Sequence, residues 1–326
     1  MFRQNKIKKD MQSNWQRYLM ISPAVIAVFV FGYLPLSGLV MAFQQQNFGK
    51  GLYNGEWIGF KNFEFLFKTT DAWVITRNTV LYNVVFIILG LILSVSLALI
   101  MNELRWKCYA KTLQTIYIMP YFLSMVVVGT IVFAFLKAEN GFVNTLFGIR
   151  VQWYQEKKIW PFLLVLAKMY CTVGFDSIIY MAVISGISSE YYESACLDGA
   201  TRWQQIIHIT LPQLRPIICI NLIRAVGGMF YSDFGLFYNV PQNTGMLYSV
   251  TDTLDTYIYR GLATLNNVGM STAAGLYQSL VGFALVLIAN KIITKIYPEG
   301  AMFYFVEERW ILNYENTNSQ KTGISY

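Results

Sequence analysis

Six long apolar runs, separated by short polar stretches, divide the chain into segments of membrane length. Each run has about 20 residues or more, which at ~1.5 Å per residue is enough to cross the hydrocarbon core of a bilayer. The pattern therefore predicts an all-α integral membrane protein with six transmembrane helices. The expected spans are Tyr18–Phe43, Thr79–Met101, Leu113–Leu136, Trp160–Gly186, Leu214–Val240 and Thr272–Tyr297.

Basic residues predict the orientation of these spans. The first run is too long for the core of a cleaved signal peptide, so we expect it to be retained. Lysine and arginine are dense at 1–17 and 102–111 and sparse in the loops at 44–78, 137–159 and 241–271. Loops rich in lysine and arginine stay on the cytoplasmic side of a membrane. We therefore expect a basic cytoplasmic N-terminus at 1–17, a six-helix membrane domain at 18–297 and a cytoplasmic tail at 298–326.

The stretch Glu193–Pro212 is a polar, helix-prone island between two apolar runs, and the predicted topology makes it cytoplasmic. Gly199 is expected to end one short helix, because glycine enters the left-handed region without steric cost. Thr201 and Gln204 fit a capping box that begins a second helix. Leu211–Pro212 is expected to redirect the chain into the next span.

Composition supports the membrane assignment and narrows the function. Hydrophobic residues make up 55% of the 326 residues and charged residues only 13%, well outside the range of soluble domains. The net charge of +7 comes from residues beside the apolar runs, so it indicates topology rather than nucleic-acid binding.

The sequence contains no motif that predicts a nucleotide-binding, metal-binding or catalytic site. No stretch matches GxxxxGK[ST], so a step driven by ATP would need another chain. The four cysteines show no CxxC spacing and are expected to be packing residues, without a metal. His208, the single histidine, is expected at an interface or in solvent, and we expect no enzymatic activity.

Four charged residues fall in the interior of the fourth and fifth predicted spans, away from the span ends, and intramembrane charges are costly unless they are paired or functional. Lys168 and Asp176 lie in the fourth span, and Arg224 and Asp233 lie in the fifth. Depth estimated along the two antiparallel helices predicts Asp176–Arg224 and Lys168–Asp233 pairs. For Lys168 and Asp233 the alternative is that both reach water in an outer vestibule.

The pattern E-S-A-x3-G-x9-I-x-L-P at 193–212 resembles the EAA loop of permease subunits in binding-protein-dependent ABC importers. Only Ser194 departs from the motif, at the second position, where the family usually has a different small residue. The similarity covers most of the chain and points to the LplB-like oligosaccharide permeases, a branch of the carbohydrate uptake group that includes the maltose permease. Further matching segments include WIGFKNFEFLF, RNTVLYN, YIMPYFLSMVVVG, TLDTYIYRGL and GLYQSLVGFALVLIANK.

This resemblance implies the type I importer permease fold, with an EAA loop at about 186–213 whose first helix sits in a cleft of a cytosolic ABC ATPase dimer. ATP and Mg²⁺ would bind that ATPase, and this chain would hold no cofactor. The implied coupling residues are Glu193, Ser194, Ala195, Asp198, Gly199, Ile209, Leu211 and Pro212. Further implied partners are a second, different permease subunit and an extracytoplasmic sugar-binding protein, in a bacterial cell membrane.

Substrate-contacting positions follow from the family by their offset from the loop. They are Lys168, Thr172, Phe175, Ala225, Gly228, Met229 and Ser232, to which we add the nearby Tyr231 and Asp233. Helix packing through small residues and aromatic rings is the alternative for each of them. Tyr180 and Tyr277 are weaker candidates. In the outer loop, Asp252, Asp255, Tyr257 and Tyr259 are candidates for contact with the binding protein, although a solvated loop is the default.

The leading hypothesis is thus a permease subunit that forms half of an oligosaccharide pathway by alternating access. The alternatives are an importer permease for a non-sugar solute, a stand-alone secondary transporter or channel, and a membrane enzyme. A secondary transporter would be favoured by an inverted repeat, and an enzyme by a cluster of acid, base or metal-binding groups.

Overall fold

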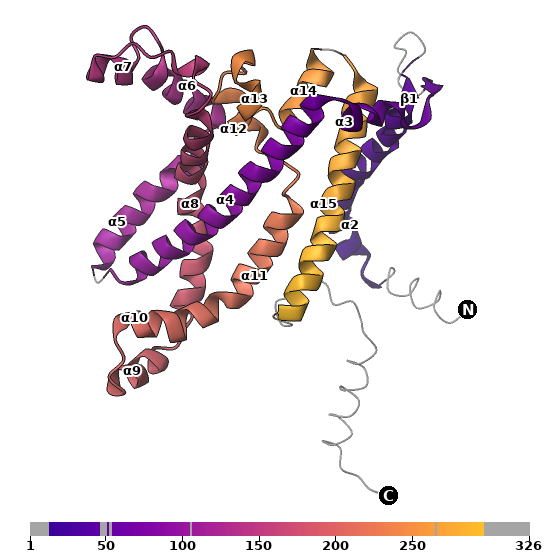
Figure 1. Cartoon of the computed structure of the whole chain (residues 1–326). Helices are drawn as coiled ribbons and strands as arrows, with labels where there is room; N and C mark the ends of the chain where they lie inside the picture. Colours follow the sequence, from indigo (N-terminus) through magenta and orange to yellow (C-terminus); the bar gives the residue numbers. More distant parts are fainter. Residues whose placement is uncertain (1–12, 46–50, 52–53, 105, 265, 297–326) are drawn as a thin grey trace, which may run out of the picture. The chain divides into compact units, whose positions relative to one another are not determined.

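The computed structural model describes residues 13–45, 51, 54–104, 106–264 and 266–296 of the chain (Figure 1). Apart from one pair of two-residue strands, the regular structure of these residues is helical. They contain five helices long and apolar enough to cross a membrane, and a sixth span if one bent helix pair is counted as a span. This confirms the predicted all-α membrane fold.

The chain divides into two compact units. One comprises residues 1–77 and 252–280, and the other comprises residues 78–251 and 281–326. Helices α4 (Thr70–Asn102) and α15 (Val268–Ile296) each run through both units. The tail predicted at 298–326 lies outside the described residues, as does most of the predicted N-terminal segment.

The first unit begins with a span that changes its helical form along its length. It consists of α2 (Trp15–Val28), a π-helical turn η1 (Phe29–Tyr33) and a 3₁₀ segment η2 (Leu34–Phe43). Pro35 lies in the first turn of η2, and its missing N–H removes one α-helical hydrogen bond at that point. The predicted first span is therefore present as an apolar helix with an irregular second half.

The segment that follows this span packs against its end. Strand β1 (Gln44–Gln45) pairs antiparallel with β2 (Glu56–Trp57), with Gln44 opposite Trp57. The ring of Phe43 stacks on Trp57 with centroids 5.6 Å apart, and the Asn62 amide donates to the carbonyl oxygens of Ala42 and Gln44. The remaining elements are η4 (Gly59–Phe63), α3 (Phe65–Lys68) and α14 (Leu254–Ala263).

The second unit contains most of the membrane helices. Before α8 its elements are α5 (Lys107–Ile118), η5 (Met119–Phe122), α6 (Met125–Leu136), α7 (Phe142–Phe147) and η6 (Trp153–Gln155). From α8 (Trp160–Ser185) onward they are α9 (Ser189–Leu197), α10 (Arg202–Gln205), η7 (Ile206–Thr210), α11 (Leu211–Gly227), α12 (Phe234–Asn239), η8 (Gly245–Leu247) and α13 (Tyr248–Thr251). Trp160 and Leu164 of α8 are fully buried, in a core shared with Phe86 of α4 and Leu236 of α12.

The third span is not the straight helix predicted at 113–136. The segments Tyr109–Phe122 and Met125–Leu136 meet at an angle of 95°. Pro120 removes a backbone donor just before the bend, and Leu123 takes an extended conformation. The Ser124 hydroxyl accepts a hydrogen bond from the Val127 N–H and caps α6, so the sequence begins a new helix there.

The fifth span also differs from the prediction of 214–240. One helix runs from Arg202 to Gly227, so Leu211–Pro212 does not redirect the chain. The π-helical turn η7 precedes Pro212, which lies in the first turn of α11 and is tolerated there. The helix ends at Gly227, where a Cβ atom would lie 2.4 Å from Val286 Cγ2 of α15, and α12 begins only at Phe234.

Gly174 allows a close approach of α8 to α5. A Cβ atom there would lie 2.0 Å from the Tyr117 carbonyl oxygen, whereas at the helical Gly275 nothing lies within 4 Å. We predict that Gly174→Ala lowers the free energy of unfolding by about 1–3 kcal/mol through overpacking, while Gly275→Ala leaves it equal or higher. Thermal unfolding of the two detergent-solubilised variants measures this, and equal melting temperatures would refute the close packing.

Candidate functional site

A cavity of about 400 Å³ lies among α4, α8 and α11 in the second unit. Its wall is unusually polar for membrane-spanning helices, and the polar or charged side chains in it are Asn83, Ser94, Lys168, Thr172, Asp176, Tyr180, Asn221 and Arg224. Apolar groups such as Phe86, Ile87 and Leu91 complete the wall. A polar cavity at membrane depth is the expected surface for a solute pathway.

The structure brings four of the nine predicted substrate positions to this cavity. These are Lys168, Thr172, Ala225 and Gly228, and the weaker candidate Tyr180 also lines it. The other five are Phe175, Met229, Tyr231, Ser232 and Asp233, which are not among the lining residues. Phe175 instead stacks on Tyr121 with centroids 3.9 Å apart, and Tyr277 lies on α15 in the first unit.

Lys168 and Asp233 form the predicted ion pair. The Lys168 Nζ lies 2.7 Å from Asp233 Oδ2, and the two side chains are 23% and 25% exposed. The other carboxylate oxygen of Asp233 accepts a hydrogen bond from the Leu236 N–H and caps α12. Because both carboxylate oxygens are engaged, Asp233 positions the chain around the cavity.

Asp176 and Arg224 do not form the ion pair predicted from their depth. Both line the cavity, but no ion pair joins them among the residues that the structure describes. The two charges lie near enough to interact electrostatically, but without the direct N–O contact of an ion pair. Arg224 is exposed and meets the open space of the cavity, so its charge can be solvated without direct contact with Asp176.

The loop between α8 and α11 has the predicted local structure. Gly199 has a φ of +79°, and the Ala200 N–H donates to the Ala195 carbonyl oxygen at the end of α9. Thr201 and Gln204 form the reciprocal capping box that begins α10. Figure 1 shows α9 and α10 together at one end of α8 and α11.

Most predicted coupling residues are accessible on this loop. Glu193, Ser194, Asp198 and Gly199 are exposed, and Ala195 is half-buried. Ile209 joins Ala195, Asp198 and Gly199 around a second cavity of about 320 Å³. Leu211 and Pro212 lie in the continuous helix that follows.

The sequence prediction missed an apolar surface on the same loop. Leu197, the last residue of α9, is 90% exposed, and Tyr191 and Trp203 are 58% and 69% exposed. Large apolar side chains on a polar loop mark an interaction site more often than a solvated face. The signal was present in the sequence, because Leu197 interrupts an otherwise polar and small-residue stretch.

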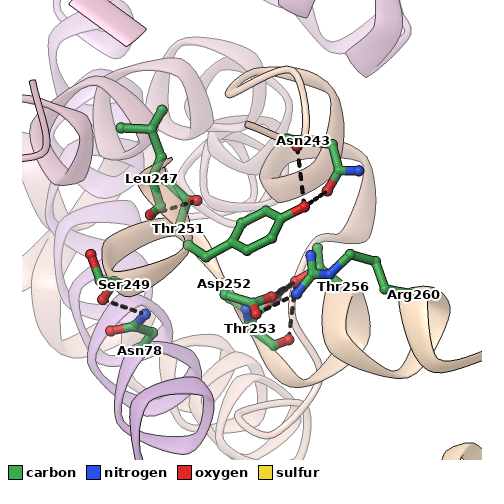
Figure 2. A network of polar contacts seen from close by, with 10 residues as sticks. Asn78, Asn243, Leu247, Ser249, Thr251, Asp252, Thr253, Thr256 and Arg260 are labelled. Atoms are coloured by element: carbon green, nitrogen blue, oxygen red, sulfur yellow. Dashed lines mark hydrogen bonds and ion pairs between the residues drawn. The ribbon is translucent and has the colours of Figure 1, made fainter. Parts of the chain in front are cut away.

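The segment predicted as a polar outer loop at 241–271 is largely helical. Figure 2 shows the contacts of Asp252, one of its two carboxylates. Asp252 is buried, accepts a hydrogen bond from the Thr256 hydroxyl at 2.6 Å and pairs with Arg260. Asp255 accepts from the Gln278 amide. Asp252 therefore stabilises α14 internally and is not a solvated contact residue.

The two tyrosines of α14 differ in their surroundings. Burial, with the nearby carboxylates of Asp71 and Asp252, raises the pKa of Tyr257 although Arg260 lowers it, so this hydroxyl stays protonated at neutral pH. Tyr259 is 42% exposed and remains the accessible member of the four predicted contact residues.

Residues 90–296 match the family model described as the binding-protein-dependent transport system inner membrane component. The chain belongs to this family. It is 31% identical to the protein LplB of Bacillus subtilis over 287 residues, covering 87% of this chain and 90% of LplB. It is also 31% identical, over 87% of this chain and 89% of the relative, to the polygalacturonan/rhamnogalacturonan transport system permease protein YteP of the same organism.

Solved structures agree with this assignment. The permease resembles a chain in the crystal structure of a bacterial ABC transporter that imports the acidic polysaccharide alginate, with a TM-score of 0.82 and 33% identity over 90% of this chain and 99% of that chain. A second match is to the alginate transporter in complex with a periplasmic protein that holds an alginate pentasaccharide, with a TM-score of 0.79, 34% identity and coverage of 88% and 97%. The family is one of transporter permeases rather than enzymes.

The Lys168–Asp233 pair generates a test of the permease's internal packing. We predict that Lys168→Met and Asp233→Asn each lower the free energy of unfolding by about 1–3 kcal/mol, because each leaves a partly buried charge without its partner. The double variant should cost less than the sum of the two single variants. Thermal unfolding in detergent gives the three values, and strict additivity would contradict a direct interaction.

Proposed function

We propose that this permease forms half of the pathway of an ATP-driven importer of oligosaccharides. The cavity among α4, α8 and α11 is the observation that carries the proposal, because its amide and hydroxyl side chains match the hydroxyl groups of a saccharide. The names of its relatives and of the structures that it resembles, which refer to polygalacturonan, rhamnogalacturonan and alginate, support a saccharide as the solute.

ATP hydrolysis would take place on a partner. In this proposal α9 docks into a cleft of a cytosolic ABC ATPase dimer, which also binds the ATP and Mg²⁺. Glu193 would pair with a basic group and fix the register, while the exposed Leu197 would supply the apolar contact.

The continuous helix from Arg202 to Gly227 gives a physical route for coupling. At ~1.5 Å per residue it extends about 35 Å from the loop to Ala225 at the cavity. A displacement of α10 by the ATPase would therefore move the cavity wall as part of one rigid body. Such movement of the wall is what alternating access requires.

The remaining partners and the orientation belong to the same proposal. The excess of basic residues at 1–17 and 102–111 supports cytoplasmic termini and a cytoplasmic α9–α10 loop in a bacterial cell membrane. A second permease subunit would complete the pathway, and an extracytoplasmic sugar-binding protein would deliver the solute at the opposite side.

Reconstitution of the complete importer in proteoliposomes tests this function. We predict uptake of a labelled oligosaccharide that needs both ATP and the binding protein. The substitution Glu193→Lys should reduce uptake and ATPase co-purification by at least about tenfold, since it reverses the charge at the proposed contact. Glu156→Lys, the same change at an exposed residue of the α7–α8 connection, should leave both unchanged.

Different failures would point to different errors. Uptake without ATP would contradict an ATP-driven importer and favour a stand-alone transporter. Uptake restricted to amino acids or ions, with ATP still required, would refute only the saccharide. Normal uptake and ATPase association in Glu193→Lys would show that the ATPase contact lies elsewhere.

A further inference from the structure

The fifth span stops inside the membrane layer. Between the end of α11 at Gly227 and the start of α12 at Phe234, the chain leaves the helical path. Asp233, at the end of this break, contacts Lys168, which lies about 12 Å along the α8 axis from Trp160 at ~1.5 Å per residue. The break therefore lies well within the depth of a membrane-spanning helix.

A helix break at this depth needs replacement hydrogen bonds. The backbone carbonyls that a broken helix leaves behind need partners from the protein or from water in the cavity that Gly228 lines. Some bonds come from the break itself, since the Met229 N–H donates to Val226 and the Tyr231 N–H donates to Gly228. The carbonyl oxygens of Met229 and Tyr231 also accept hydrogen bonds from another helix.

Asn83 of α4 supplies such donors. Its side-chain Nδ2 lies 3.0 Å from the Met229 carbonyl oxygen and 3.2 Å from the Tyr231 carbonyl oxygen. The same Nδ2 also donates to the Thr79 carbonyl oxygen one turn earlier in α4, at 2.9 Å. Because this NH2 group has two hydrogens for three acceptors, one hydrogen is shared between two carbonyls, and the amide links its own helix to both carbonyls of the break.

Asn83 is also part of the cavity wall. It lines the cavity together with Gly228, which directly precedes Met229, and with Ala225, which lies one helical turn before Met229. On the other side of the break, Lys168 holds Asp233 and so fixes the start of α12. The break is held between these two contacts, and its position sets the shape of this wall.

We propose that Asn83 is a positioning residue of the solute pathway, which acts by holding the α11–α12 break and thereby the cavity wall at Ala225 and Gly228. This role rests on the proposed import function, since the wall matters only if solute passes it. Asn83 acts through the backbone of 229–231, so the property required of it is hydrogen-bond donation.

The donor requirement gives a test by pH. The carboxylate introduced by Asn83→Asp only accepts hydrogen bonds and repels the carbonyls, whereas its protonated form offers one O–H donor. The carbonyls in direct contact and the Asp176 carboxylate in the same cavity raise the pKa of such a carboxyl. Of the two cations in this cavity, Lys168 is engaged by Asp233 and Arg224 is exposed, so mild acid should restore part of the donation. Asn83→Leu has similar size and no donor at any pH.

Transport by the reconstituted importer should follow this pattern. We expect Asn83→Asp to reduce the initial rate of oligosaccharide uptake about tenfold at pH ~7.5. At pH ~5.5 the rate of this variant should lie within about threefold of the wild-type rate at the same pH. Asn83→Leu should remain low at both values. Asn102→Asp, the same change at the exposed end of α4, should behave as wild type.

Hydrogen–deuterium exchange of the assembled importer tests the contact without solute. Amides of residues 229–236 should exchange about tenfold faster in Asn83→Leu than in wild type, with α9 unchanged. Unchanged exchange would overturn the contact. Faster exchange with normal uptake, or equal loss of uptake in both variants without recovery in acid, would overturn the positioning role.

The two measurements separate this inference from the import function. Exchange is read in the wild-type and variant complexes without any substrate. A wild-type importer that takes up no saccharide would therefore refute the proposed function, while the exchange of residues 229–236 would still decide whether Asn83 holds the break.

Discussion

Every backbone polar group inside a bilayer needs a hydrogen-bond partner. Between Gly227 and Phe234, where the helix is broken, these partners must come from outside the regular helix. The chain meets this requirement with polar side chains from neighbouring helices. The amide of Asn83 binds the carbonyls of Met229 and Tyr231, and Asp233 caps α12 while it pairs with Lys168. These polar groups gather beside an irregular backbone, and the polar cavity of the permease lies next to them. Asn83 and Lys168 thus both line the cavity and stabilise the broken span.

The opposite end of the same helix carries the loop that the proposed ATPase would hold. Gly199 turns the chain between α9 and α10, and the capping box of Thr201 and Gln204 begins the helix that continues without interruption to Gly227. The segment from Arg202 to Gly227 is one helix, which contains the π-helical turn η7 and Pro216. A contact made by Glu193 or Leu197 on α9 would reach this helix through the packing of α9 against α10, where the Gln205 amide donates to Cys196 Sγ, and the helix would transmit it to Arg224 at the cavity.

Local patterns in the sequence were sufficient for the features that depend on nearby residues. Apolar runs predicted the membrane fold, and the spacing of Thr201 and Gln204 predicted the capping box. Features that depend on packing were missed. Phe234, Leu236 and Phe237 continue the apolar pattern past Gly228, so hydropathy did not reveal the break. Pro120 and Ser124 signalled the bend in the third span only weakly. Helix depth correctly indicated that Asp176 and Arg224 lie near each other, but it could not show that they make no direct ion pair.

Coupling between the loop and the cavity is the central claim, and cysteine labelling measures it most directly. Ala225→Cys, in a chain whose own four cysteines are replaced, would be labelled with a membrane-impermeant maleimide in the complete importer, with and without a non-hydrolysable ATP analogue. We expect the nucleotide to change the labelling rate, and we expect Glu193→Lys to abolish that change while the rate without nucleotide stays the same. A nucleotide effect of equal size in both chains, or none in either, would contradict coupling through this loop.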